Sequence, residues 1–215
     1  MKTGDGATHR EFESHTLRQR ITVTLIQVAV IFFLWHNEEK DGDEMGKILG
    51  SWSGMRKYLE QEMLAESLRG RIRYGCTSYA GMDGCHIFEI CIDGKQVKRF
   101  SWETVNAYFI DNGYTCNKNP KGMGEYWTEF WPLLDKHPIT DRTEYTDEEF
   151  CNALENYRNQ DIQESLYSNN PLIRMFAIFD RRVGKRTLTK LESELDKQPE
   201  WLRQMYLLRF GADLN

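Results

Sequence analysis

Apolar residues recur three and four positions apart at the start of the globular part of the chain. In the segment 55–68 the residues that follow this spacing are Tyr58, Leu59, Met63, Leu64 and Leu68. The spacing is typical of an amphipathic helix, because it places the apolar side chains on one face. Ser51 or Ser53 can cap the first turn, and Gly70 follows the last. We therefore predict a helix over about residues 55–68.

Three short runs then alternate between apolar and polar residues, which is the two-residue period of a β-strand. They span residues 71–79, 86–92 and 96–100. Asp93-Gly94 lies between the last two runs and favours a tight hairpin turn, since Asp and Gly tolerate the positive φ angles that such turns need. The runs predict three strands, the last two of them joined as a hairpin.

A helix is predicted directly after the strands. Ser101 can cap its first turn, the helix continues through about Ile110, and Asn112-Gly113 ends it. The order α-β-β-β-α is shared with double-stranded-RNA-binding domains. Those domains contact RNA through lysines at the start of this helix, whereas Glu103 occupies that region here and repels phosphate. We therefore expect no nucleic-acid binding by this unit.

An aromatic helix is predicted over residues 125–135, after a loop rich in Asn, Lys, Pro and Gly. Trp127, Phe130, Trp131 and Leu134 follow one helical stripe, with Tyr126 beside it. Such a stripe is typical of a seam between subdomains, and an exposed part of it would form a binding groove. Pro132 predicts an interruption of this helix.

Every segment from residue 146 onward has a helical pattern. Thr146 and Glu149 match a capping box, while Pro171 and Pro199 stand where helices begin. Helices are predicted over residues 146–157, 161–167, 172–183, 185–195 and 199–210. A repeated Pro-helix-Gly frame indicates HEAT-like helical hairpins, although two copies fall short of the three that a solenoid needs.

These elements predict an α+β fold with three parts. An α-β-β-β-α module spans residues 45–113, and an aromatic helix with connecting loops spans residues 114–145. A helical subdomain occupies residues 146–215.

Part of the first forty-four residues can be back-translated into a tRNA sequence. Arg10 to His15 can be encoded as CGU GAG UUC GAA UCU CAC, which contains the fully paired stem and the loop of a tRNA T-arm. Thr16 to Gln19 can continue this RNA into an acceptor strand that ends in CCA. We interpret residues 1–44 as translated tRNA and intergenic DNA, with the start codon at Met45 or Met55. Because tRNA ends are common integration points, we expect mobile-element cargo.

An apolar run within this leader has an alternative interpretation. Residues 21–35 follow Arg18 and Arg20 and precede acidic residues, as in a membrane anchor with a positive inner flank. A spanning helix needs about 20 residues, and this run has fifteen. We expect no membrane association if translation starts near Met45.

Charge and cysteine usage favour a cytoplasmic protein. The chain has 28 basic and 33 acidic residues, of which five basic and eight acidic residues lie in the leader. Residues 45–215 therefore contain 23 basic and 25 acidic residues and have a net charge of −2. This near balance gives no overall field that would attract nucleic acid or anionic lipid. The five cysteines are odd in number and form no CxxC pair, which is typical of a reducing compartment.

Four soft metal ligands lie close together in the sequence. Cys76, Cys85, His86 and Cys91 could form a Cys3His zinc site. However, Cys91 should point away from the face that Ile90 and Ile92 share, and no tight ligand knuckle is present. We interpret these cysteines as small buried hydrophobic residues and expect no metal or other cofactor.

The densest basic segment follows the predicted helix 172–183. We call its cations the basic corner: Arg181, Arg182, Lys185, Arg186 and Lys190. One interpretation is a solvated helix end, where cations complement the dipole and Asp180 pairs locally. In the functional interpretation, these side chains hold an anion or an acidic partner between two helices.

Residues 45–215 contain no recognisable catalytic constellation. Only two histidines occur there, His86 and His137, and the motifs GxSxG and HExxH are absent. His137 lies near Asp135 and Asp141 in a pattern that is ordinary for a helix end. We therefore expect a protein that is not an enzyme.

Four segments resemble an uncharacterised family of bacterial proteins: FSWETVNAYF (100–109), RTEYTDEEFCNAL (142–154), DRRVGKRTL (180–188) and QPEWLRQMYLLR (198–209). The resemblance covers about residues 52–215 and leaves out the leader. It implies a bacterial cytoplasmic protein and supplies no catalytic residues.

We expect a non-enzymatic interaction or adaptor protein whose helical half binds a protein partner through the basic corner or a concave side. The alternative is a metal-dependent or anion-binding enzyme or factor that uses Cys85-His86 or the residues from Arg181 to Arg186.

Overall fold

The computed structural model describes residues 51–214, apart from 79–85 and 115–120. The segment Ser51–Asn215 forms one compact unit. The predicted leader (1–44), its apolar run, Met45, Cys85 and Cys116 lie outside the described residues. Within the described ranges, no helix has the length and apolar character needed to cross a membrane.

The first helix changes its winding along its length. An α-helical part, α3 (Trp52–Lys57), begins after Ser51, whose hydroxyl accepts a hydrogen bond from the Gly54 N–H at 3.3 Å. A six-residue π-helix, η1 (Tyr58–Met63), follows, and a 3-10 turn, η2 (Glu66–Leu68), closes the segment. The predicted helix over residues 55–68 is confirmed only in part, because helical winding begins at Trp52 and ends at Met63, and Leu64 has an extended backbone. The π-helical winding was not predicted.

The three predicted strands are confirmed and form an antiparallel sheet in the order β1-β2-β3. Their bounds are β1 (Ile72–Ser78), β2 (His86–Ile92) and β3 (Lys95–Phe100). Asp93 and Gly94 join β2 to β3 with φ angles of 50° and 80°. Both angles are positive, as a type I′ hairpin turn requires.

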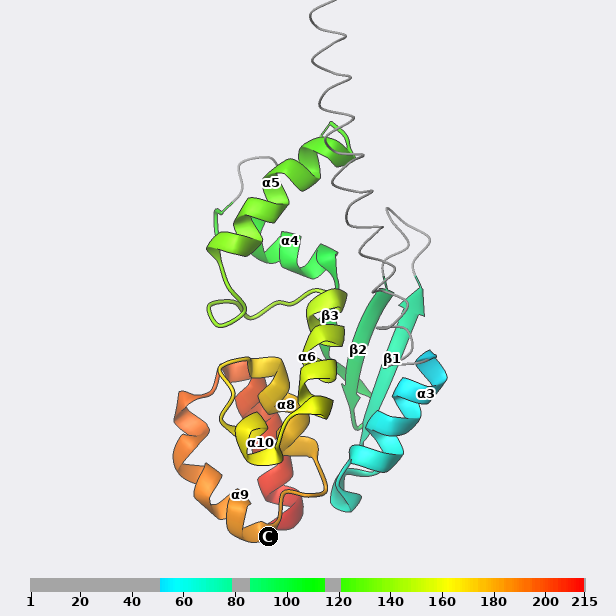
Figure 1. Cartoon of the computed structure of the whole chain (residues 1–215), viewed down its shortest axis with the longest axis vertical. Coiled ribbons are helices and arrows are strands. Elements are labelled where there is room, and N and C mark those ends of the chain that lie inside the picture. Colours follow the sequence, from blue (N-terminus) through cyan, green and yellow to red (C-terminus); the bar gives the residue numbers. More distant parts are fainter. Residues whose placement is uncertain (1–50, 79–85, 115–120, 215) are drawn as a thin grey trace, which may run out of the picture. The chain divides into compact units, whose positions relative to one another are not determined.

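One face of the sheet packs against α6 (Asp147–Asn159). The ring of Phe150 on α6 lies 4.8 Å from those of Phe88 and Phe100, measured between centroids. Trp52 of α3 lies 5.5 Å from Phe88 on the same face. Figure 1 shows α6 and α3 beside the strands. The sheet is thus buried through aromatic side chains, which contribute large apolar areas.

Two helices after the sheet share a small core of their own. The helix α4 (Trp102–Asp111) begins at the predicted cap Ser101, and α5 (Met123–Lys136) follows the second undescribed loop. Val105, Phe109 and Phe130 form the centre of this core. The predicted interruption at Pro132 is wrong, because α5 continues to Lys136. Pro132 is exposed, so the carbonyl that lacks its usual partner can be hydrated.

The C-terminal half is helical, as predicted, and α8 (Pro171–Phe179) lies at its centre. All residues of α8 except Arg174 are buried. Neighbouring helices on three sides account for this burial, since α6, α7 and α10 all contact α8. The remaining helices are α7 (Ile162–Leu166), α9 (Lys185–Leu191), the 3-10 helix η3 (Glu192–Lys197) and α10 (Glu200–Asp213).

Two predicted helix ends in this half are wrong. The helix α8 ends at Phe179 and not at Val183, because Asp180 has an extended backbone and forms a β-bridge with Leu64. The final helix continues through Gly211 to Asp213, where the Asp213 carboxylate pairs with Arg209 at 2.5 Å. The overall α+β class is confirmed, whereas the division into a module and a helical subdomain stays a prediction.

Candidate functional site

The acidic residue of the basic corner is a buried hydrogen-bond centre. Asp180 accepts hydrogen bonds from the Tyr157 hydroxyl and from Nε and Nη2 of Arg182, the last two at 2.9 and 2.7 Å. The Arg182 backbone N–H also donates to this carboxylate, at 2.6 Å. Burial raises the pKa of Tyr157, and its hydrogen bond to Asp180 acts in the same direction. Arg182 is therefore held by the fold, and its Nε and Nη2 groups already donate to Asp180 and Tyr157.

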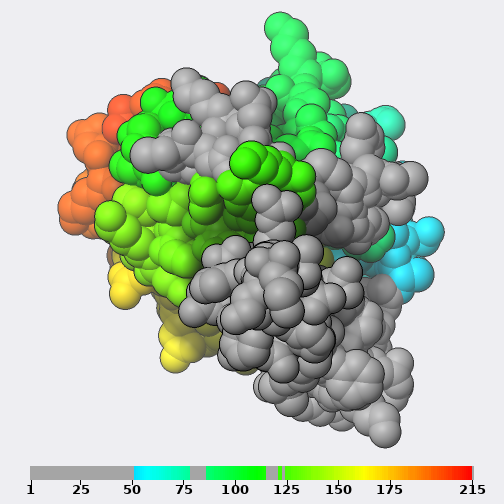
Figure 2. Space-filling view, turned by 90° about the horizontal axis from the view of Figure 1, so that it is seen from above, coloured from blue at the N-terminus to red at the C-terminus, as the bar shows by residue number. Residues whose placement is uncertain are grey.

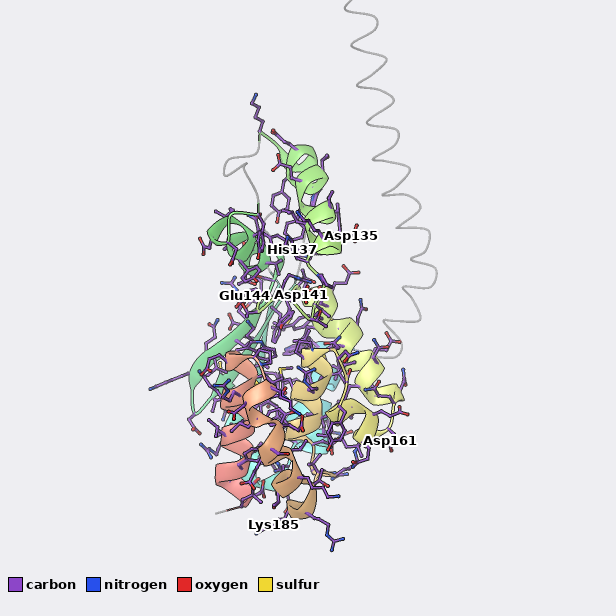
Figure 3. The ribbon with its side chains drawn as sticks, turned by 90° about the vertical axis from the view of Figure 1, so that its left-hand side faces the viewer. Asp135, His137, Asp141, Glu144, Asp161 and Lys185 are labelled. Atoms are coloured by element: carbon purple, nitrogen blue, oxygen red, sulfur yellow. The ribbon has the colours of Figure 1, made fainter. Side chains whose placement is uncertain are left out.

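The other four cations of the basic corner are free of such partners. Arg181, Lys185, Arg186 and Lys190 are exposed, and none of them pairs with a carboxylate within the described part of the chain. Lys185 and Arg186 occupy the first turn of α9, which has no acidic residue and no side-chain cap. Cations are disfavoured at a helix N-terminus, which applies to Lys185 and Arg186. Arg182 pairs with Asp180 just after α8, and Lys190 lies in the last turn of α9, so the interpretation as a solvated helix end stays a prediction. Figure 3 labels Lys185 at the lower end of the ribbon.

The π-helix η1 lies against the basic corner. The Arg181 N–H donates to the Met63 carbonyl at 2.9 Å, and the Arg158 guanidinium stacks 4.9 Å from the centre of the Tyr58 ring. Burial raises the pKa of Tyr58, and the negative charge of Asp180 adds to the effect. The π-helix η1 is thus hydrogen-bonded to the segment that carries the basic corner.

The predicted aromatic stripe lies between α4 and α5. Trp102 of α4 contacts Trp127, Phe130 and Trp131 of α5, with centroids 5.0 to 5.1 Å apart, and Tyr126 stacks on Phe130 at 5.3 Å. Phe130 is buried, whereas 41% of Trp131 is exposed. Atoms of α5 lie at the surface in Figure 2. The stripe is thus a helix-helix seam with one exposed edge.

The zinc candidates do not converge within the described structure. Cys76 pairs with Phe88 and Cys91 pairs with Arg73 in the β1-β2 register, which places the two thiols on opposite faces of the sheet. His86 stands at the start of β2, and Cys85 is not described. No group of three or more His, Cys, Asp or Glu residues able to hold a metal occurs among the described residues.

A carboxylate and two thiols between α6 and the sheet have perturbed pKa values. Burial raises the pKa of Asp147, whose carboxylate accepts a hydrogen bond from the His86 N–H at 3.1 Å. Burial also raises the pKa of Cys76, and it raises that of Cys151 to about 12, with the Asp147 charge acting in the same direction on both thiols. Thiol groups of this kind stay protonated at neutral pH and are poor nucleophiles.

A pocket that the sequence reasoning missed lies between α3, η1 and the start of β1. Its volume is about 530 Å³, and three arginines line it together with Glu60, Gln61, Gly70 and Ile72. The arginines are Arg56, Arg69 and Arg73. A signal for it is present in the sequence, because RGRIR (69–73) repeats arginine at every second position ahead of an apolar strand.

The fold and these two cationic sites define an α+β protein that presents positive charge at separate surfaces. The chain belongs to the SF0329 protein family, whose model matches residues 51–210. This match confirms the resemblance inferred from the four sequence segments, while bacterial origin stays a prediction. Neither the curated proteins nor the solved structures contain a match to this chain.

Proposed function

We propose that this protein is a non-enzymatic cytoplasmic interaction protein that binds an acidic protein segment through the basic corner. The observation that supports this function is the set of four exposed cations, Arg181, Lys185, Arg186 and Lys190, that have no acidic partner among the described residues. Like charges in one short segment repel each other, and an acidic partner relieves that repulsion.

The placement of Lys185 and Arg186 strengthens the argument. Five of the other described α-helices carry an acidic residue in the first turn, as α6 does with Asp147, Glu148 and Glu149, whereas α3 and α8 carry none. The first turn of α9 instead combines two cations with the glycine cap Gly184. Local helix stability does not favour this choice, so we attribute it to binding.

Arg182 has a different role in the proposed site. Its guanidinium is held by Asp180 and Tyr157, and these contacts also raise the pKa of Arg182. Arg182 therefore fixes the turn between α8 and α9, so that the remaining cations are presented from a stable backbone.

The test is a photo-crosslink from the corner in cells. A photoreactive residue replaces the exposed Thr189 on α9, and the adduct is mapped by mass spectrometry. We expect an adduct to an acidic segment of one protein, which is lost when Arg186→Glu and Lys190→Glu are combined. The control combines Lys95→Glu and Lys136→Glu, which reverse two exposed cations outside the corner.

Adducts to nucleic acid would contradict the proposal, because the proposed partner is a polypeptide. Adducts that persist after charge reversal would contradict it as well, since an electrostatic interface depends on those charges. Raising the salt concentration should weaken the adduct of the unmodified chain, because salt screens exposed charges.

A further inference from the structure

The pocket beside the π-helix lies apart from the residues of the basic corner and has the chemistry of an anion site. It is an open depression with a volume of about 530 Å³, lined by Arg56, Glu60, Gln61, Arg69 and Arg73 around the buried Ile72. We propose that this pocket binds a small phosphate monoester. This inference does not depend on the proposed function of the corner.

The charges in the pocket match a dianion. Three arginines and one glutamate, Glu60, are among the lining residues, which gives the lining a net charge of +2. The Glu60 carboxylate is already engaged, because it accepts a hydrogen bond from the Tyr74 N–H at 2.8 Å. A phosphate monoester carries −1.5 to −2 charges at neutral pH, as phosphorylated side chains do. Its binding therefore neutralises the pocket.

The guanidinium groups have unused hydrogen-bond donors. Among the described residues, the guanidinium group of Arg73 makes no hydrogen bond or ion pair. Arg56 approaches Glu60 only to 3.8 Å, and Arg69 approaches Glu66 only to 3.6 Å. These distances exceed those of charge-assisted hydrogen bonds, which are about 2.7–2.9 Å. Guanidinium groups bind phosphate through two parallel hydrogen bonds, and a bound phosphate could thus replace these long contacts.

The π-helix accounts for the shape of the pocket. A π-helix has wider turns than an α-helix, is rare, and occurs frequently at functional sites. Here η1 supplies Glu60 and Gln61 to the wall. Because η1 ends at Met63, the Gln61 carbonyl lacks a helical partner and accepts a hydrogen bond from Arg69 Nη2 at 3.1 Å. This bond draws Arg69 toward the pocket.

The size of the pocket indicates an ester and not the inorganic ion. Ligand pockets in proteins measure about 300–1,000 Å³, and the observed 530 Å³ lies within this range. Inorganic phosphate fills only a small part of such a volume.

The test is calorimetric titration of the full chain with three phosphate monoesters: glycerol 3-phosphate, glucose 6-phosphate and adenosine 5′-monophosphate. Glycerol, glucose, adenosine and inorganic phosphate are titrated for comparison. We expect at least one ester to bind more tightly than both its neutral alcohol and inorganic phosphate. Arg73→Gln should weaken that ester by about tenfold or more, because a charge-assisted hydrogen bond contributes about 1.5–3 kcal/mol.

Control variants separate this site from the basic corner and from a loss of folding. Lys95→Gln removes an exposed cation from the same sheet but outside the pocket, and it should bind the ester like the unmodified chain. The combined Arg186→Glu and Lys190→Glu variant should do the same. If Arg73→Gln lowers the melting temperature, Arg56→Gln takes its place, since Arg56 is exposed on α3.

Three results would overturn the inference. The first is that no ester binds more tightly than inorganic phosphate. The second is that the folded Arg73→Gln or Arg56→Gln variant binds as the unmodified chain does. The third is that charge reversal in the corner, and not in the pocket, abolishes binding, which would assign the ester to the basic corner.

Discussion

Buried charges in this protein are each held by several partners. Lys98 is almost fully buried, and its ammonium group donates to the Thr143 carbonyl at 2.5 Å and pairs with Glu144 at 2.7 Å. It also lies 5.4 Å from the ring centres of Tyr145 and Trp201. Burial lowers the pKa of Lys98, and Glu144 opposes this change. Such a residue stabilises the fold only while all its partners remain in place.

Asp147 is a half-buried carboxylate with a raised pKa, and this leads to a pH-dependent prediction. Burial raises its pKa in the folded chain, so the folded state binds more protons than the unfolded state between the two pKa values. The contribution of Asp147 to the free energy of unfolding is therefore lost as pH rises through this window. The Asn side chain of the Asp147→Asn variant does not titrate, so the variant does not lose stability in this way. We expect the stability of the variant relative to the unmodified chain to increase as pH rises from about 4 to 7.

Urea unfolding at several pH values measures this difference. Asp111→Asn is the control, because Asp111 is an exposed carboxylate at the end of α4. A stability difference between Asp147→Asn and the unmodified chain that stays constant over the pH range would contradict the role of burial.

The helix α6 shows how strongly a local signal can determine an element. The Thr146 hydroxyl accepts a hydrogen bond from the Glu149 N–H at 3.0 Å, and the Glu149 carboxylate accepts one from the Thr146 N–H at 2.9 Å. Glu149 also pairs with the buried Arg142. We expect Thr146→Ala to lower the free energy of unfolding by about 0.5–2 kcal/mol, as the loss of a helix cap does.

Chemical denaturation of the variant measures this loss. Thr143→Ala serves as the control, because Thr143 is exposed and contributes its backbone carbonyl to Lys98. Equal stabilities of the two variants would show that the capping box contributes little.

Elements whose signals are local could be predicted, and elements that depend on distant residues could not. The Asp93-Gly94 turn and the Thr146 cap depend on neighbouring residues alone. The end of α8 depends on Leu64, which pairs with Asp180 from more than a hundred residues away. The local pairing of Asp180 could be expected from the sequence, but the hydrogen bond from Arg182 to the Tyr157 hydroxyl could not, because Tyr157 belongs to a different helix.

The arginine pocket shows the same limit at the level of a site. Arg56 and Arg73 come from different elements, and only the packing of η1 against β1 brings them together. The π-helical winding has no periodicity that the apolar pattern of residues 55–68 reveals. The alternation of arginine in residues 69–73 was the available signal, and it was interpreted only as a strand.

At the scale of the whole molecule, two regions differ in how deeply they are buried. Nearly all of α8 is buried beneath its neighbouring helices, whereas Phe130 is the buried residue of α5 among its described side chains. Local opening requires less free energy where fewer apolar groups are buried. We expect backbone amides in α8 to exchange most slowly with deuterium and those in α5 to exchange much faster, as measured by mass spectrometry.

A core substitution tests whether these regions are independent. Phe130→Ala removes the centre of the α4-α5 core, and a Phe→Ala change in a core costs about 3–5 kcal/mol. We expect faster exchange in α4 and α5 with unchanged exchange in α8. Uniformly faster exchange throughout the described chain would show that both regions unfold together.

The π-helix η1 also bears on the evolutionary history of the family. A π-helix closes hydrogen bonds over one residue more than an α-helix, so a relative with a one-residue deletion between Tyr58 and Met63 can wind this segment as a regular α-helix. Such a deletion would rotate the residues before it relative to those after it, and Glu60 and Gln61 would no longer share a wall with Arg73. A family member with such a deletion is therefore expected to lack this pocket.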